Sequence, residues 1–220
     1  TGWGRRLVRG VVNYSRHAAW RLWLKSGGQD ASLWLPPGWR GDGIIARIGT
    51  RAAARRVRAT GVPVVKRHQL LGQMLAGAYG IAVAGTHGKT TTSAMLAVML
   101  DALGLSPTYI VGGMIPQLGA NARAGEGPHF VIEADEYDRT FHGLRPDIAV
   151  VLNVEMDHPD CYADLADMQA AYATFLEGVA PGGHIVACAD SPALGEVLRA
   201  LPQAEGRVVT YGRAAGAAYP

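Results

Sequence analysis

Short apolar runs alternate with stretches of helical periodicity over most of this chain, and the alternation becomes regular from about residue 80 onward. The runs that predict strands lie at 62–65, 81–84, 109–111, 130–132, 148–154, 184–189 and 208–211. Helices are predicted at 52–59, at 68–75, after residue 88, after Asp164 and from Ser191 onward. Strands that alternate with helices are typical of an α/β domain with a mostly parallel sheet.

Two of these elements have a more specific pattern. The helix behind residue 88 has an apolar stripe spaced as one helical face, and Gly104 is expected to end it. The stripe consists of Met95, Leu96, Met99, Leu100 and Leu103. The run 148–154 is apolar on both faces, which predicts a buried parallel strand.

Three of the predicted strands end in polar residues. They are followed by GTHGKTT at 85–91, EADE at 133–136 and NVEMDH at 153–158. Ligands of open α/β sheets bind outside the carboxyl ends of the strands. We therefore expect one functional site at this edge of the sheet.

The segment GTHGKTT lies between a predicted strand and a predicted helix. Gly85 and Gly88 allow the backbone to curl so that successive N–H groups, together with the helix N-terminus, face phosphate oxygens. Lys89 can reach the β- and γ-phosphates of a nucleoside triphosphate, and Thr90 offers a hydroxyl to Mg²⁺. The strict pattern G-x-x-x-x-G-K-[ST] is not met, because Val83 stands at its first glycine, but the shorter form G-T-x-G-K-T is complete.

Carboxylates crowd the next two strand ends. Glu133, Asp135, Glu136 and Asp138 follow one strand, and Asp157 and His158 follow the other. Such groups repel one another unless cations lie among them, and oxygen ligands suit the Mg²⁺ that accompanies ATP. His158 either binds a metal or orients a carboxylate, while a solvated acidic loop is the alternative for the whole group. His87 either contacts a substrate anion or merely tolerates the turn.

The formal charge of +3 conceals two unlike parts. Residues 1–67 contain 14 Lys or Arg and two acidic residues, whereas residues 68–220 contain 7 basic and 16 acidic residues. All five tryptophans lie within the first 39 residues. A basic segment of this kind suits nucleic acid or an anionic membrane surface. However, residues 1–50 have no sustained amphipathic period, RNA-binding motif or zinc pattern, so we expect neither partner.

Several other classes of protein are not supported by the sequence. No apolar run approaches the roughly 18 residues of a membrane helix, and no secretory signal pattern is present. Cys161 and Cys188 are too few for a disulfide framework and lack metal-ligand spacing. We expect reduced thiols and a cytoplasmic protein.

Together these motifs resemble the Mur ligases, which build the peptide stem of the bacterial cell wall. The resemblance begins at about Ala53 and covers about three quarters of the chain. It rests on GVPVVKRHQLLGQM (61–74), GIAVAGTHGKTTTSAML (80–96), FVIEADEYDRTFHGLRPDIAVVLNVEMDHPDCY (130–162) and FLEGVAPGGHIVACAD (175–190). GTHGKTTT and EADE, with N-x-x-x-D-H at a fixed distance, are together highly specific.

The resemblance implies ATP-dependent amide synthesis with Mg²⁺, in which the lactyl carboxylate of UDP-N-acetylmuramate is joined to L-alanine through an acyl phosphate. It implies that Lys89 holds the β- and γ-phosphates, that Thr90 and Glu133 bind the first Mg²⁺, and that His158 serves a second metal or the acyl phosphate. Asn153 is implied beside the nucleotide. The loop backbone is implied as the phosphate cradle, formed by Gly85, Thr86, His87, Gly88, Lys89, Thr90 and Thr91.

Two departures from the family pattern set the expected domains. Residues 1–79 lack the glycine-rich loop that binds UDP, so we expect a degenerate or partial N-terminal domain of UDP-binding type. We hypothesise that residues 1–50 are frameshifted, divergent or mis-called. Residues 80–220 are expected to form a truncated central ATP-binding domain, with the family's C-terminal domain absent. Such a fragment is expected to bind ATP weakly and to be inactive alone.

Other functions remain open at this point. A related ligase that recycles a preformed tripeptide onto UDP-N-acetylmuramate is the main alternative, although the compact stretch 144–162 lacks the longer insertion expected there. Folylpolyglutamate synthetases share the loop but less of the acidic pattern. A non-catalytic nucleotide-binding remnant and a nucleic-acid binder are alternatives from other classes.

Overall fold

The computed structural model describes residues 10–12, 22, 38–46, 48 and 50–220. The chain divides into two compact units, Thr1–Val64 and Val65–Pro220. The first unit contains helix α2 (Arg51–Arg58), which begins where the Thr50 side chain accepts a hydrogen bond from the N–H of Ala53 at 3.1 Å. Four of the five tryptophans fall outside the described residues, so the hypothesis about residues 1–50 stays a hypothesis.

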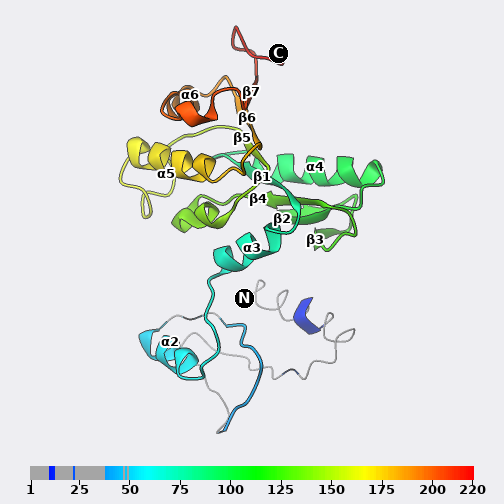
Figure 1. The fold of residues 1–220 in the computed structure, drawn as a ribbon, viewed down its shortest axis with the longest axis vertical. Coiled ribbons are helices and arrows are strands. Elements are labelled where there is room, and N and C mark those ends of the chain that lie inside the picture. The colour runs from blue at the N-terminus through cyan, green and yellow to red at the C-terminus, as the bar shows by residue number, and fades with distance from the viewer. Residues whose placement is uncertain (1–9, 13–21, 23–37, 47, 49) are drawn as a thin grey trace. The chain divides into compact units, whose positions relative to one another are not determined.

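The second unit is built around one seven-stranded sheet with the order β3-β2-β4-β1-β5-β6-β7 (Figure 1). The bounds of its strands are β1 Tyr79–Ala84, β2 Thr108–Ile115, β3 Ala120–Arg123, β4 His129–Glu133, β5 Ile148–Val151, β6 His184–Cys188 and β7 Val208–Tyr211. All pairings are parallel except that of β2 with β3. The predicted mostly parallel α/β fold is therefore confirmed.

The strand order places β1 between β4 and β5. Val83 of β1 is level with Glu133 of β4, and Ala84 is level with Val151 of β5. The three polar segments that follow these strands consequently begin side by side. This register brings the predicted functional edge together.

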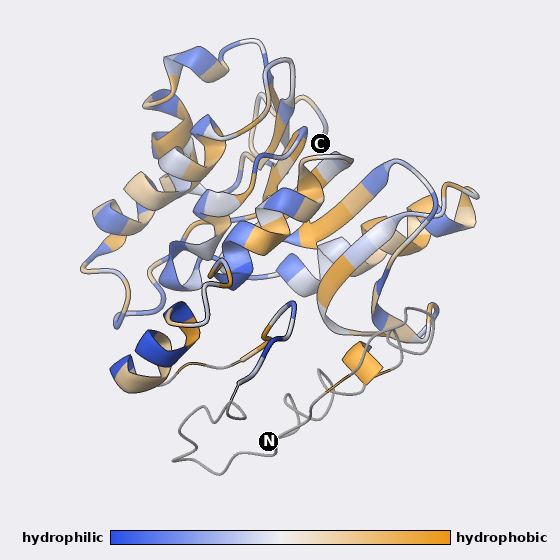
Figure 2. Ribbon diagram, turned by 60° about the horizontal axis from the view of Figure 1, so that its bottom comes forward, coloured by the Kyte–Doolittle hydropathy of each residue, from blue (hydrophilic) through white to orange (hydrophobic). Residues whose placement is uncertain are grey.

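Helices cover both faces of the sheet. They are α3 (Arg67–Leu75), α4 (Lys89–Ala102), α5 (Leu165–Glu177) and α6 (Pro192–Arg199), with short 3₁₀ helices η1 (Tyr137–Gly143) and η2 (Pro202–Ala204). One buried cluster joins α5, α6 and η1 to one face, and a second joins α4 to the other face. The hydropathy colours show hydrophobic strands between these layers (Figure 2). None of the helices in the described part of the chain has the length and hydropathy needed to cross a bilayer.

Most of the predicted elements are present, with two corrections. The run 62–65 is not a strand: it has no regular structure and pairs with no strand among the described residues. The strand predicted at 148–154 ends at Val151, because the chain then turns across the neighbouring loop. The cap of α5 agrees with expectation, since the Asp164 carboxylate accepts from the N–H of Asp167 at 2.8 Å. Both cysteines are free thiols.

The predicted stripe of α4 is not its buried face. Met95, Met99 and Leu103 are 59%, 57% and 71% exposed, whereas Ser93 and Ala97 are fully buried. Small side chains at these two positions allow the helix to approach the sheet closely, and half-buried Leu96 and Leu100 flank the contact. The periodicity therefore located the helix, and of its stripe only Leu96 and Leu100 pack against the core.

Candidate functional site

The loop between β1 and α4 has the backbone that its glycines permit. Gly85 has φ 140° and Gly88 has φ 88°, and Gly88 is the residue directly before α4. A Cβ at Gly85 would lie 3.0 Å from the Cβ of Leu152. Glycine is therefore required at Gly85 both for the left-handed conformation and for the close approach of the neighbouring segment.

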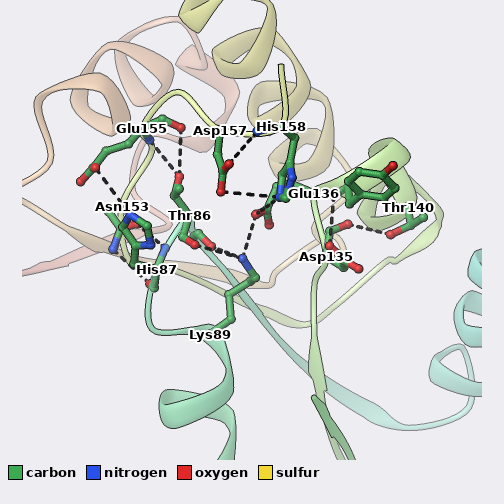
Figure 3. Close-up of polar contacts among 12 residues, drawn as sticks. Thr86, His87, Lys89, Asp135, Glu136, Thr140, Asn153, Glu155, Asp157 and His158 are labelled. Carbon is green, nitrogen blue, oxygen red and sulfur yellow. Dashed lines mark hydrogen bonds and ion pairs between the residues drawn. The ribbon is translucent and has the colours of Figure 1, made fainter. Parts of the chain in front are cut away.

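The loop is tied to the segment that follows β5. Thr86 donates its N–H to the carbonyl of Asn153 at 3.1 Å, and its hydroxyl accepts from the N–H of Glu155 at 2.9 Å. The Asn153 side chain accepts from the N–H of His87 at 2.8 Å and donates to the His87 carbonyl at 3.1 Å (Figure 3). These bonds fix the position of the loop. The exposed His87–Glu155 pair, 3.7 Å apart, adds little to this.

Lys89, the first residue of α4, turns its ammonium back over the loop. The Nζ atom donates to the carbonyl oxygens of Gly85 at 2.6 Å and Thr86 at 3.3 Å, and to Glu136 Oε1 at 2.8 Å. An ammonium has three N–H donors, so all of them are used. Lys89 is thus oriented by the loop and by a carboxylate from the neighbouring strand end.

Glu136 joins two predicted site residues that come from different strand ends. Its side chain is 1% exposed, and Oε1 also lies 3.5 Å from the Nε2 of His158 (Figure 3). His158 has a left-handed φ of 53°, its N–H donates to Asp157 Oδ1 at 2.7 Å, and its ring packs edge-on against Tyr137. The structure therefore brings Lys89 and His158 to the same carboxylate oxygen.

Thr90 and Glu133 converge at a separate point beside Gly112 of β2. A Cβ at Gly112 would lie 2.9 Å from Glu133 Oε2 and 3.3 Å from Thr90 Oγ1. The N–H of Gly112 also donates to Glu133 Oε1 at 2.6 Å. A hydroxyl and a carboxylate thus face the same small space, which only glycine leaves open.

The loop that carries Glu136 is supported from α5. Asp138 and Arg139 both have φ 52°, an uncommon conformation for residues with a Cβ. The Arg139 guanidinium donates to both carboxylate oxygens of Asp167, at 2.7 and 2.8 Å, and covers the Tyr162 ring. Burial raises the pKa of Tyr162 to about 12, against a smaller lowering by Arg139, so the phenol stays protonated. Its Oη donates to the Glu136 carbonyl at 2.5 Å.

The oxygen ligands at this edge fit Mg²⁺, which prefers hard oxygen donors and keeps phosphate oxygens among its ligands. Thr90 and Glu133 supply such donors, whereas His158 lies beside Glu136 instead. No group of three His, Cys, Asp or Glu side chains within the described residues could hold a metal without other ligands. A magnesium ion here needs the Thr90 hydroxyl and the phosphates of a nucleotide as further ligands.

A cavity of about 450 Å³ lies between the segment that follows β5 and the segment that follows β6. Leu152, Asn153 and Glu155 line it from the segment behind β5, and Cys188, Asp190 and Ser191 line it from the end of β6. Ser191 also accepts from the N–H of Val154 at 3.2 Å. The cavity is therefore continuous with the segment that holds the loop.

The predicted site residues lie at or just after the carboxyl ends of β4, β1 and β5, and four of them meet in two separate pairs. Lys89 and His158 meet at Glu136, while Thr90 and Glu133 meet at Gly112. Thr91 lies exposed in the first turn of α4. The sequence patterns gave no separate role to Glu136, Glu155 or Gly112. The GG pair at 112–113 was the available signal for Gly112, and Glu155 lies within the NVEMDH segment at 153–158.

The fold and the loop together define an α/β domain of the phosphate-loop class. The Mur ligase middle domain matches residues 83–219, and the chain therefore belongs to the Mur ligase family. This confirms the resemblance inferred from the motifs.

The relatives are longer than this chain. The UDP-N-acetylmuramate–L-alanine ligase of Streptomyces avermitilis is 48% identical over 162 residues, which are 74% of this chain and 35% of that protein. The enzyme of the same name from Acidobacterium capsulatum is 46% identical over 163 residues, again 74% and 35%. The chain thus spans about a third of the length of these relatives.

Two solved structures have a similar fold. The UDP-N-acetylmuramate:L-alanyl-γ-D-glutamyl-meso-diaminopimelate ligase from Neisseria meningitides has a TM-score of 0.66 and 32% identity, covering 76% of this chain and 56% of that one. The UDP-N-acetylmuramate-alanine ligase from Thermotoga maritima has a TM-score of 0.60 and 28% identity, covering 73% and 35%.

Proposed function

We propose that this chain supplies the ATP-binding part of a ligase that joins L-alanine to the lactyl carboxylate of UDP-N-acetylmuramate. The observation that carries the proposal is the position of Lys89, at the head of α4 and beside a glycine loop already fixed by Asn153 and Glu155. Relatives 46–50% identical to the chain carry this activity in their names, which supports the choice of substrates.

The proposed reaction begins with transfer of the γ-phosphoryl group of ATP to the lactyl carboxylate, giving an acyl phosphate and ADP. The amine of L-alanine then attacks the acyl carbon, an amide bond forms and inorganic phosphate leaves. Attack of a carboxylate on a phosphate brings like charges together, so the transferring group must be neutralised. The loop N–H groups and Lys89 provide positive charge for this.

Thr90 and Glu133 would hold Mg²⁺ beside the phosphates, since their oxygens converge at Gly112. The bound ion would supply positive charge to the transferring phosphoryl group. His158 lies close enough to Lys89, through Glu136, to serve either a second metal or the acyl phosphate. We propose that the nucleoside binds in the cavity lined by the segment after β5 and the end of β6. Such a reaction uses small molecules in the cytoplasm and needs neither nucleic acid nor a membrane.

We expect the 220 residues to bind ATP but not to complete the reaction alone, because the chain spans only about a third of the length of the ligases it matches. Phosphate release measured with ATP, UDP-N-acetylmuramate and L-alanine should equal the background rate. Alanine-dependent turnover would overturn this part of the proposal and leave the ATP site intact.

The tripeptide-recycling reaction is the second candidate, favoured by the fold similarity to the Neisseria enzyme. The same phosphate-release assay, run on a full-length relative that contains this domain, separates the two reactions. Turnover with L-alanine supports the first, and turnover with the tripeptide alone supports the second.

Titration calorimetry with Mg-ATP tests the ATP site directly. We expect saturable binding by the unaltered chain and at least tenfold weaker binding by Lys89→Ala, because a charge-assisted contact to phosphate is lost. Lys66→Ala removes the same charge at an exposed position outside the site and should bind normally. Equal affinities in Lys89→Ala and the unaltered chain would contradict the proposal.

A further inference from the structure

Glu136 belongs to the EADE motif, yet the proposed reaction gives it no role. Its carboxylate is 1% exposed and is the acidic partner of Lys89, with Oε1 2.8 Å from the ammonium. The other oxygen, Oε2, is buried and has no hydrogen-bond partner among the described residues. A buried carboxylate is unfavourable unless it is paired, and this one is only half satisfied.

The surroundings hold Glu136 in this position. Tyr162 donates to its carbonyl oxygen, and the next turn passes through the left-handed residues Asp138 and Arg139. Arg139 is in turn fixed by Asp167. Several side chains and a strained turn thus hold the incompletely paired carboxylate of Glu136 against Lys89. Such an arrangement is unexpected if Glu136 serves packing alone.

The three acceptors of Lys89 are not equivalent. Two are carbonyl oxygens of the loop, at Gly85 and Thr86. Hydrogen bonds to Asn153 and Glu155 hold that loop in place. Glu136 is the third acceptor and the charged one. A phosphate oxygen that binds the ammonium must replace one of them, and only a second anion can replace Glu136 without loss of charge pairing.

We propose that Glu136 is a positioning residue for Lys89: it holds the ammonium at the loop as an internal counter-ion and releases it to the triphosphate when nucleotide binds. After release, His158 remains within 3.5 Å of the same carboxylate oxygen. The inference rests on the proposed ATP site. It assigns Glu136 an action through Lys89 rather than a contact with the reacting atoms.

The first test uses the nucleotide-free chain. Only three lysines are present, at positions 25, 66 and 89, so ¹⁵N-lysine labelling gives three ammonium signals. Hydrogen exchange of the Lys89 ammonium should be slow in the unaltered chain and at least tenfold faster in Glu136→Gln, because the amide oxygen is a weaker, uncharged acceptor. Added ATP should slow the exchange again in the variant, since phosphate then takes over as the partner.

The second test is the affinity for ATP without Mg²⁺, measured by calorimetry in the presence of a chelator. We expect Glu136→Gln to bind about tenfold more tightly, because nucleotide no longer competes with a carboxylate for the ammonium. A residue needed only for packing would give unchanged or weaker binding. The sign of the change therefore separates positioning from a structural role.

Asp138→Asn is the matched control, since it removes one charge from the same turn at an exposed side chain and asparagine tolerates a left-handed φ. It should leave both measurements unchanged. If Glu136→Gln does not fold, Glu136→Asp retracts the carboxylate and should change both quantities in the same direction by a smaller factor.

Unchanged Lys89 exchange in Glu136→Gln, or unchanged or weaker ATP binding by that variant, would overturn the inference. Failure of the unaltered chain to bind ATP overturns the proposed function instead. In that case the exchange measurement still decides whether Glu136 holds Lys89.

Discussion

Asn153 holds His87 through both ends of its side-chain amide: Oδ1 accepts the His87 N–H at 2.8 Å, and Nδ2 donates to the His87 carbonyl at 3.1 Å. The two residues lie in different loops, behind β5 and behind β1. The family resemblance placed Asn153 beside the nucleotide. The contacts of its side chain connect it to the backbone of the phosphate loop.

Asn153→Ala should weaken ATP binding by about tenfold, because removing both bonds frees the loop and ordering it again opposes binding. Calorimetry with Mg-ATP measures the loss. Asn121→Ala is the control, since Asn121 also donates to a backbone carbonyl, that of Val111, but in the β2–β3 hairpin. Equal losses in both variants would show that the effect is not specific to the loop.

Gly112→Ala should remove the gain in ATP affinity that Mg²⁺ provides and leave Mg-free binding unchanged. The new methyl group would lie 2.9 Å from Glu133 Oε2 and 3.3 Å from Thr90 Oγ1. These are ends of side chains that can move, so the fold should survive while the two oxygens separate. Binding is measured with and without Mg²⁺, and Gly77→Ala, with nothing within 4 Å, serves for comparison. A normal Mg²⁺ response would argue against the Thr90–Glu133 site.

Two glycines within helices should respond to alanine in opposite directions. A Cβ at Gly72 of α3 would lie 2.2 Å from the carbonyl oxygen of Gly143, so Gly72→Ala should destabilise the protein by about 1–3 kcal/mol. Gly195 of α6 has nothing within 4 Å, and Gly195→Ala should stabilise it by about 0.5–1 kcal/mol through helix propensity. Denaturant unfolding measures both. A stable Gly72→Ala would show that α3 and η1 separate easily.

Acid should selectively weaken the contact between Arg139 and Asp167. The hydrogen bond from Arg139 lowers the pKa of Asp167, with help from the N–H of Ala163. A lowered folded-state pKa stabilises the fold above the unfolded-state pKa of about 4, and this contribution disappears as the pH falls through the lower folded-state value.

Asp167→Asn should therefore reduce the Tm at neutral pH. The difference from the unaltered chain should begin to shrink near pH 4 and disappear as the pH falls below the lowered folded-state pKa of Asp167. Thermal unfolding across the range of pH 2–7 measures this. Glu205→Gln, at an exposed position, should show no such trend. A Tm difference that stays constant down to pH 2 would exclude the carboxylate as its cause.

Patterns that are local in the sequence predicted most of the fold. Apolar runs located the central strands, and glycine, aspartate and proline located several helix ends, because these features depend on neighbouring residues. The apolar stripe located α4 but does not coincide with its buried face, since close approach to the sheet selects Ser93 and Ala97 over the larger Met95 and Met99. Hydrophobic periodicity does not include that steric requirement.

Features that depend on distant contacts were not predictable in this way. Strand β3 pairs with β2 across residues without an apolar pattern, and η1 contains the left-handed pair Asp138–Arg139, which Asp167 supports from another helix. The pairing of Lys89 with Glu136 rather than Glu133 also depends on contacts between distant parts of the chain. Four carboxylates crowd that strand end, and only the turn behind β4 decides which one meets the ammonium.

The central position of β1 has a consequence for synthesis on the ribosome. The phosphate loop is complete once residue 91 has been made, but its supports come from strands on both sides, and the last of them ends 60 or more residues later along the chain. Nascent chains halted before Glu155 should therefore lack a formed loop. Nucleotide would then first protect the growing polypeptide from proteases only after β5 has joined β1.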